Sequence, residues 1–122
     1  LLAKRPAFLF LYYLCPKNFL LMQDNSQNII SFSQSSSGEK ILEYAPSGVC
    51  SRFITIKVDS NNIVQDVVFF GGCSGNTQGL GALIKGMPAK EAMQRLKGIC
   101  CGNKTTSCPD QLSNALFEII KR

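Results

Sequence analysis

Cysteine constrains this chain more than any other residue type. The sequence has six cysteines and no histidine. Four of the cysteines, Cys50, Cys73, Cys101 and Cys108, lie where loops meet predicted strands or helices. Sulfur is therefore the soft ligand and the strong nucleophile that the chain offers. Catalytic Ser-His-Asp triads, Cys-His proteases and His-based zinc hydrolases all need an imidazole, so the sequence excludes these three classes.

Composition divides the chain near residue 44. Residues 1–44 form an N-terminal extension, in which 23–38 are rich in Asn, Gln and Ser, as linkers are. Residues 45–122 are predicted to form the single folded domain. Below about 80 residues burial alone gives marginal stability, and natural folds often add a disulfide or a metal. A metal bound by sulfur would supply that stabilisation here.

The start of the chain raises a targeting question. An apolar run at 7–14 follows two basic residues, but it is too short to span a membrane. Cys15 and Pro16 follow it, rather than the small residues of a signal-peptide cleavage site. We expect Met22 to be the natural start, with 1–21 as upstream sequence; the alternative is a membrane anchor. The six cysteines lack the density of a disulfide scaffold, so we expect a cytoplasmic protein.

The charge pattern argues against nucleic acid as a partner. The net charge is +5, and the basic residues of the predicted helices and loops are scattered, without interleaved stacking aromatics. The glycine-rich segment 71–76 lacks the Gly-Lys-Ser/Thr ending of a phosphate loop and the full dinucleotide fingerprint. We therefore interpret these glycines as turn and close-packing residues, and we expect no direct binding of DNA or RNA.

Alternation of apolar residues predicts a β-hairpin. Residues 52–58 and 63–70 read as strands, and the Asp-Ser-Asn-Asn segment at 59–62 reads as their turn. Cys50 has the same parity as Ile54 and the other apolar residues of the first strand, which predicts that it points to the buried side.

Helical spacing predicts three further elements. The first helix covers 74–85, the second begins at Pro88 and ends before Gly98, and the third begins at Pro109 and runs to the end of the sequence. Asp110 suits the positive end of the last helix. The expected fold class is α+β: a small antiparallel sheet built on the hairpin, with one face covered by three C-terminal helices.

The predicted elements bring the thiols toward one end of the sheet. Cys73 and Cys108 lie at the starts of helices, where free N–H groups and the helix dipole favour thiolate. A flexible loop connects Cys101 to Cys108, and Cys50 comes from the strand opposite Cys73. Four converging thiolates suit tetrahedral zinc or an iron–sulfur cluster, whereas magnesium prefers oxygen ligands.

Two other readings of the thiols remain open. Cys101 and Cys108 can form a redox dithiol that cycles with a disulfide, and free cysteines can simply pack as small apolar residues. In the metal reading, Arg52 and Lys104 would offset the negative charge of four thiolates. Cys100 is excluded from the site because it adjoins Cys101, and adjacent residues cannot readily share a tetrahedral ion.

The segment Thr-Ser-Cys-Pro-Asp at 106–110 spells the signature of the TSCPD domain family. Other short motifs also resemble the free-standing members of that family, from about Pro46 to Arg122: Gly48–Ser51, Gly71–Asn76, Gly86-Met87, Cys101-Gly102 and Asp110–Leu112. The resemblance implies an accessory role in deoxyribonucleotide synthesis, with ribonucleotide reductase or a related protein as partner. Family members are commonly labelled ribonucleoside-diphosphate reductase, but this chain is too short to be a complete enzyme of that kind, and we predict no catalytic residues.

The order of elements and cysteines also resembles the U-type iron–sulfur scaffold proteins. Cys50, Cys73 and Cys108 fall on the three scaffold thiol positions. The chain departs from that pattern at Arg52, where an acidic residue is expected, and at Ser107, where histidine is expected. This resemblance implies an iron–sulfur scaffold or carrier as a further alternative. Cys101 would add a fourth sulfur, which suits holding a metal better than releasing a cluster.

Overall fold

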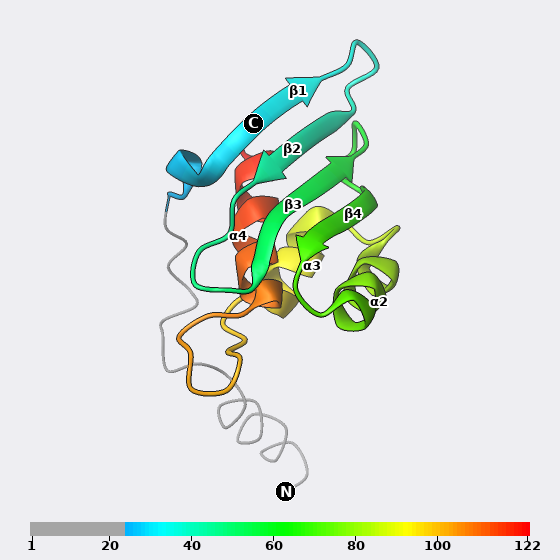
Figure 1. Cartoon of the computed structure of the whole chain (residues 1–122). Helices are drawn as coiled ribbons and strands as arrows, with labels where there is room; N and C mark the ends of the chain where they lie inside the picture. The colour runs from blue at the N-terminus through cyan, green and yellow to red at the C-terminus, as the bar shows by residue number, and fades with distance from the viewer. Residues whose placement is uncertain (1–23) are drawn as a thin grey trace, which may run out of the picture.

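The chain folds as one antiparallel sheet with three helices packed on one of its faces (Figure 1). The computed structural model describes residues 24–122; the apolar run at 7–14, Cys15 and the proposed start at Met22 lie outside them. The fold class is α+β, as the sequence predicts. In chain order the elements are the short 3-10 helix η1 (Ser26–Asn28), β1 (Ile29–Gln34), β2 (Lys40–Tyr44), β3 (Ser51–Val58), β4 (Val64–Gly71), α2 (Ser74–Ile84), α3 (Ala89–Leu96) and α4 (Cys108–Ile120).

The predicted hairpin is confirmed as β3 and β4, which pair antiparallel with Ile56 opposite Val67. Its turn is fixed by Asp59, whose carboxylate oxygen Oδ1 accepts hydrogen bonds from the backbone N–H groups of Asn61 and Ile63 at 2.9 Å each. Asn62 has a φ of 59°, a left-handed conformation that Asn tolerates better than most residues. Local turn chemistry therefore sets the register of the hairpin.

The sheet contains two more strands than the sequence predicts. β1 pairs with β2 and β2 pairs with β3, so the strand order is β1-β2-β3-β4. The linker interpretation is wrong for Ile29–Gln34, because β1 presents Ser31 and Ser33 to solvent and packs Phe32 against the core. A short strand that is polar on one face has the composition of a linker.

The core lies between the sheet and the helices. α4 packs behind the middle of the sheet, where Leu112, Leu116 and Ile119 are fully buried (Figure 1). α3 packs against α4, and α2 lies beside β4. Within residues 24–122 no helix is long and apolar enough to cross a membrane.

We expect the glycines of α2 to respond oppositely to alanine. A Cβ at Gly81 would lie 2.9 Å from the carbonyl oxygen of Val67 on β4, whereas a Cβ at Gly79 would meet nothing within 4 Å. Gly81→Ala should therefore push α2 from the sheet and lower the free energy of unfolding. Gly79→Ala should raise it by about 0.5–1 kcal/mol, because alanine favours a helix over glycine. Urea unfolding followed by circular dichroism measures both, and equal effects would contradict the close approach.

Tyr44 should make the fold sensitive to alkaline pH. Its side chain is fully buried, and its hydroxyl has no hydrogen-bond partner among the described residues. Burial, followed by the charge of Glu118, raises the pKa of Tyr44 from 10.0 to about 12. The unfolded chain ionises first, so this contribution to stability is complete below pH 10 and is lost as the pH rises toward 12. Tyr44→Phe should lose less stability over that range than the wild type, as thermal melts will show.

Candidate metal centre

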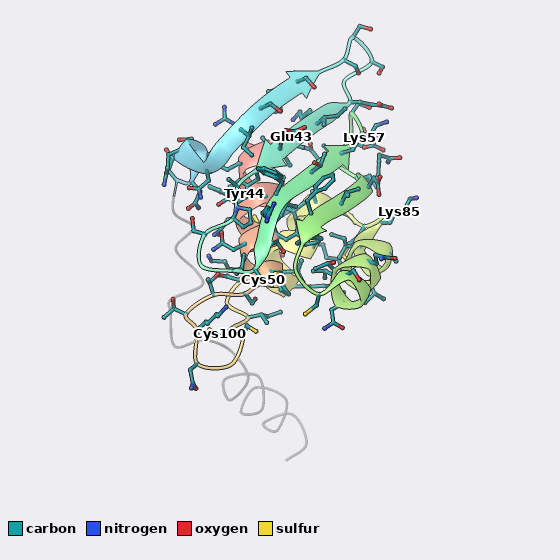
Figure 2. All side chains as sticks on the ribbon, in the orientation of Figure 1. Glu43, Tyr44, Cys50, Lys57, Lys85 and Cys100 are labelled. Carbon is teal, nitrogen blue, oxygen red and sulfur yellow. The ribbon has the colours of Figure 1, made fainter. Side chains whose placement is uncertain are left out.

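One pocket of about 330 Å³ is lined by all four thiols that the sequence singles out. It lies at the end of the sheet where β3 begins and β4 ends, the end at which Cys50 is labelled in Figure 2. Cys50, Cys101 and Cys73 are exposed, Cys108 is partly buried, and all four thiols are free. The rest of the lining comes from α2, the start of α4 and the residue before it: Asn76, Thr77, Leu80, Ser107 and Pro109.

Cys50 lines this pocket, but its side chain does not point to the side of β3 that the sequence predicts. The register of β3 and β4 shifts between Ser51 and Phe53, so Arg52 is an extra residue in the ladder. Ser51 is thereby buried, and Cys50 is exposed. The prediction that Cys50 points to the buried side is wrong. The extra residue, Arg52, shifts the inward and outward alternation by one for the residues that precede it, so Ser51 points inward and Cys50 does not. The exposed thiol nevertheless borders the pocket.

Ser51 contacts one of the pocket thiols directly. Its side chain is 4% exposed, and its hydroxyl oxygen Oγ lies 3.1 Å from the sulfur of Cys108. Gly72, with a φ of 79°, allows this packing: a Cβ there would lie 3.0 Å from the Ser51 oxygen and 3.2 Å from the Cys50 sulfur. Sequence reasoning gave Ser51 no role, although this residue ends the motif Gly48–Ser51.

Helix starts position two of the thiols, as predicted. Cys73 is the N-cap residue of α2, and its side chain makes no capping hydrogen bond. Cys108 is the first residue of α4, which Ser107 caps by accepting a hydrogen bond from the backbone N–H of Asp110 at 3.1 Å. The Ser-x-x-Asp spacing of Ser107 and Asp110 is a helix-start signature that can be recognised in the sequence. Both sulfurs therefore belong to the first turn of a helix.

The loop that carries Cys101 is closed on itself. The Cys101 N–H donates to the carbonyl of Thr106 at 3.1 Å, and the Lys104 N–H donates to the carbonyl of Cys101 at 3.0 Å. These bonds bring the two ends of the loop together, so Cys101 is held near the start of α4. Gly102 and Asn103 at the tip are exposed.

Asp110 anchors that loop to the core. The side chain is 3% exposed, and its Oδ1 accepts from the backbone N–H of Gly98 at 2.8 Å while Oδ2 accepts from the Thr106 hydroxyl at 2.6 Å. The ammonium of Lys97 lies 3.4 Å from Oδ1 and donates to the amide oxygen of Asn114 at 2.9 Å. Sequence reasoning placed Asp110 at the helix start but missed Lys97, because the contact joins two separate elements.

Arg52 and Lys104, the predicted charge-balancing residues, are both exposed. Neither forms a hydrogen bond or an ion pair through its side chain within the part of the chain described. Their positive charges therefore remain available near Cys50 and Cys101, their neighbours in the sequence. Their role stays a prediction.

The four sulfurs line one pocket, but within residues 24–122 they do not lie close enough together to form a coordination shell. Among residues 24–122 no three Cys, Asp or Glu side chains lie close enough to hold one metal ion. The donor set itself is soft, with four thiols and no carboxylate in the lining. The pocket thus offers soft donors that do not converge on one point within residues 24–122, and metal binding by these thiols stays a prediction.

The fold and the site together define this protein as a small α+β domain with four thiols around one pocket. The chain belongs to the TSCPD domain family, whose family model matches residues 32–120. The match begins within β1, ahead of the boundary expected at residue 44. The domain is associated with ribonucleotide reductase-related proteins. No match was found among curated proteins or among solved structures, so the likeness to U-type scaffolds rests on the order of cysteines and elements.

The structure explains why the signature reads Thr-Ser-Cys-Pro-Asp. Thr106 donates to Asp110, Ser107 caps α4, Cys108 faces the pocket, and Pro109 occupies the first turn, where a missing N–H costs little. Asp110 then holds the loop through Gly98. Four of the five residues thus serve to place the fifth, the thiol.

Asp110→Asn should destabilise the fold and loosen the loop. Asparagine has one acceptor oxygen where the aspartate uses two, so either Gly98 or Thr106 loses its partner, and Lys97 loses its counter-charge. Breaking such a buried charged network costs about 3 kcal/mol. Urea unfolding measures the loss, with the exposed Asp66→Asn as the matched control. Equal midpoints for Asp110→Asn and the wild type would contradict the anchoring role.

Proposed function

We propose that this chain is a metal-binding accessory module of a ribonucleotide reductase-related system. In this proposal Cys50, Cys73, Cys101 and Cys108 bind zinc or an iron–sulfur cluster, and the domain acts in deoxyribonucleotide synthesis through its partner. The supporting observation is that four thiols from four separate segments line a single pocket. Ordinary buried cysteines have no reason to gather in this way, and three of these four are exposed.

The chain's own residues suit the task. The sulfurs of Cys73 and Cys108 lie at helix starts, where the helix dipoles would offset the negative charge of a thiolate site. Arg52 and Lys104 supply two cations whose side chains have no partner within residues 24–122. The Ser51 hydroxyl lies 3.1 Å from the Cys108 sulfur, and it would donate to that sulfur if Cys108 bound a metal as a thiolate, a contact that orients a ligand. Zinc or a cluster, when bound, would crosslink the four segments and stabilise a small core.

Binding requires the sulfurs to draw closer together. The loop between Cys101 and Thr106 is the segment that would move, because its tip is exposed and the backbone bond from the Cys101 N–H to the carbonyl of Thr106 would have to open for Cys101 to shift. Cys50 and Cys73 are held by the hairpin and by α2, so they form the stationary side of the pocket. The proposal therefore includes closure of the Cys101 loop over the pocket.

A thiol redox relay to a ribonucleoside-diphosphate reductase is the second candidate. One observation favours it: Cys101 and Cys108 are free, both border the pocket, and they flank one closed loop. Such a pair can pass two electrons by forming a disulfide while a partner disulfide is reduced to two thiols. The scaffold or carrier reading requires cluster transfer to an acceptor protein and shares the same thiols.

Cys108→Ala should release the metal and lower the melting temperature, because a four-thiolate site loses one ligand and the fold loses its crosslink. Elemental analysis of anaerobically purified protein, joined to thermal melts, measures both effects. We expect about one zinc or iron centre per chain in the wild type if the site closes as proposed. Leu83→Ala, which alters an exposed residue of α2 outside the pocket lining, is the control for metal content.

Two results would overturn the metal proposal. Full occupancy and an unchanged melting temperature in Cys108→Ala would remove Cys108 from the ligand set. Metal-free wild-type protein with a titratable Cys101–Cys108 disulfide would favour the redox relay instead.

A further inference from the structure

The face of the sheet that the helices leave open carries four exposed apolar side chains among its polar ones. Six large hydrophobic side chains of the described residues are exposed, and strand alternation places four of them on this one face. A solvated face of an antiparallel sheet normally carries polar residues, and clustered apolar side chains mark interaction surfaces. We call this surface the open face; its apolar members are Ile41, Phe53, Val68 and Phe70.

The apolar cluster has a defined centre. Phe53 and Phe70 lie opposite each other on β3 and β4, 45% and 51% exposed, with ring centroids 6.4 Å apart and the rings edge to face. Val68 lies two residues from Phe70 on the same face, opposite Thr55. By the register of β3 and β4 these residues share the face of the sheet that points away from α3 and α4, and that face is toward the viewer in Figure 1.

Charges on and beside the open face come in opposite signs. Lys57 is paired with Glu39 at 3.3 Å, and Asp66 accepts a hydrogen bond from the next backbone N–H. Glu43 on β2 and Arg52 at the bulge beside Phe53 are left, and neither side chain makes a hydrogen bond or an ion pair within residues 24–122. Within residues 24–122 the acid Glu43 and the base Arg52 therefore flank the aromatic pair without partners. Asp66 also forms no ion pair there, and it lies opposite Lys57 in the pairing of β3 and β4.

We propose that the open face is the interface of a homodimer, in which two copies of this chain pack sheet against sheet. A twofold axis lying between the two faces, midway between Arg52 and Glu43, brings Arg52 of each copy over Glu43 of the other. The same axis stacks the two Phe53–Phe70 patches. The pairing is isologous, so each contact occurs twice and the assembly closes as a dimer.

Charge complementarity favours a second copy over other occupants. Three of the charges that make up the net +5 are Lys4, Arg5 and Lys17, which lie outside the described residues, so the net charge does not decide what the open face binds. Around its apolar centre the open face offers a base, Arg52, and an acid, Glu43, and such a pair complements itself in a second copy. A strongly acidic or strongly basic partner would leave one of these two charges unmatched.

Sedimentation velocity over a wide range of protein concentration tests the interface. The wild type should sediment with twice the mass of one chain, and Phe53→Asp should halve that mass by placing two buried carboxylates against each other. Leu83→Asp is the matched control, since Leu83 lies on α2 and is 78% exposed; it should stay dimeric. Circular dichroism checks that each variant is folded. A monomeric wild type, or a dimeric folded Phe53→Asp, would overturn the proposal.

A charge exchange tests the orientation. Arg52→Glu and Glu43→Arg should each weaken the dimer at least tenfold by opposing like charges, and the double variant should recover most of that loss. No recovery in the double variant would overturn this geometry. Phe53 does not line the pocket, so Phe53→Asp should keep the metal content of the wild type and separates the two proposals. Arg52→Glu is scored on dimerisation alone, because Arg52 is also the proposed charge-balancing residue of the metal site. A monomeric variant with normal metal supports both proposals, whereas a metal-free dimer removes only the metal site.

Discussion

The buried carboxylate of Asp110 is the interaction on which the thiol pocket depends. Through two oxygens it joins the end of α3 at Gly98, the cysteine loop at Thr106 and the start of α4. A buried carboxylate without these donors and without Lys97 would be costly, so each partner is needed by the others. This mutual requirement fixes where the loop begins and ends relative to α4, and therefore where Cys101 and Cys108 can lie.

The other half of the pocket follows from strand pairing. Hairpin register sets Ser51 opposite Gly71, which places the residues before β3 and after β4 at the same end of the sheet. Gly72 then allows the chain to pass within contact of the Cys50 sulfur before α2 starts. Backbone geometry thus brings together Cys50 and Cys73, which are far apart in the sequence. Side-chain hydrogen bonds of Asp110 position Cys101 and Cys108.

Sequence patterns predicted the features that arise from local chemistry. The hairpin, the three helices and the helix-start positions of Cys73 and Cys108 follow from turn residues, periodicity and capping, and the structure confirms them. β1 was missed because its outward serines hide a strand among linker-like residues. Cys50 was assigned to the wrong side because one extra residue at Arg52 reverses the alternation. The network of Asp110 was missed because it connects elements distant in sequence.

The bulge at Arg52 links the two surfaces of the domain. By adding one residue between Ser51 and Phe53, it turns Ser51 inward to the Cys108 sulfur while Arg52 and Phe53 are both exposed. A regular strand would alternate, and Arg52 and Phe53 would then point to opposite sides of the sheet. The thiol pocket and the open face therefore both depend on this one bulge in β3. The extra residue places Ser51 against the pocket and Phe53 on the open face, although the two lie only two positions apart on one strand.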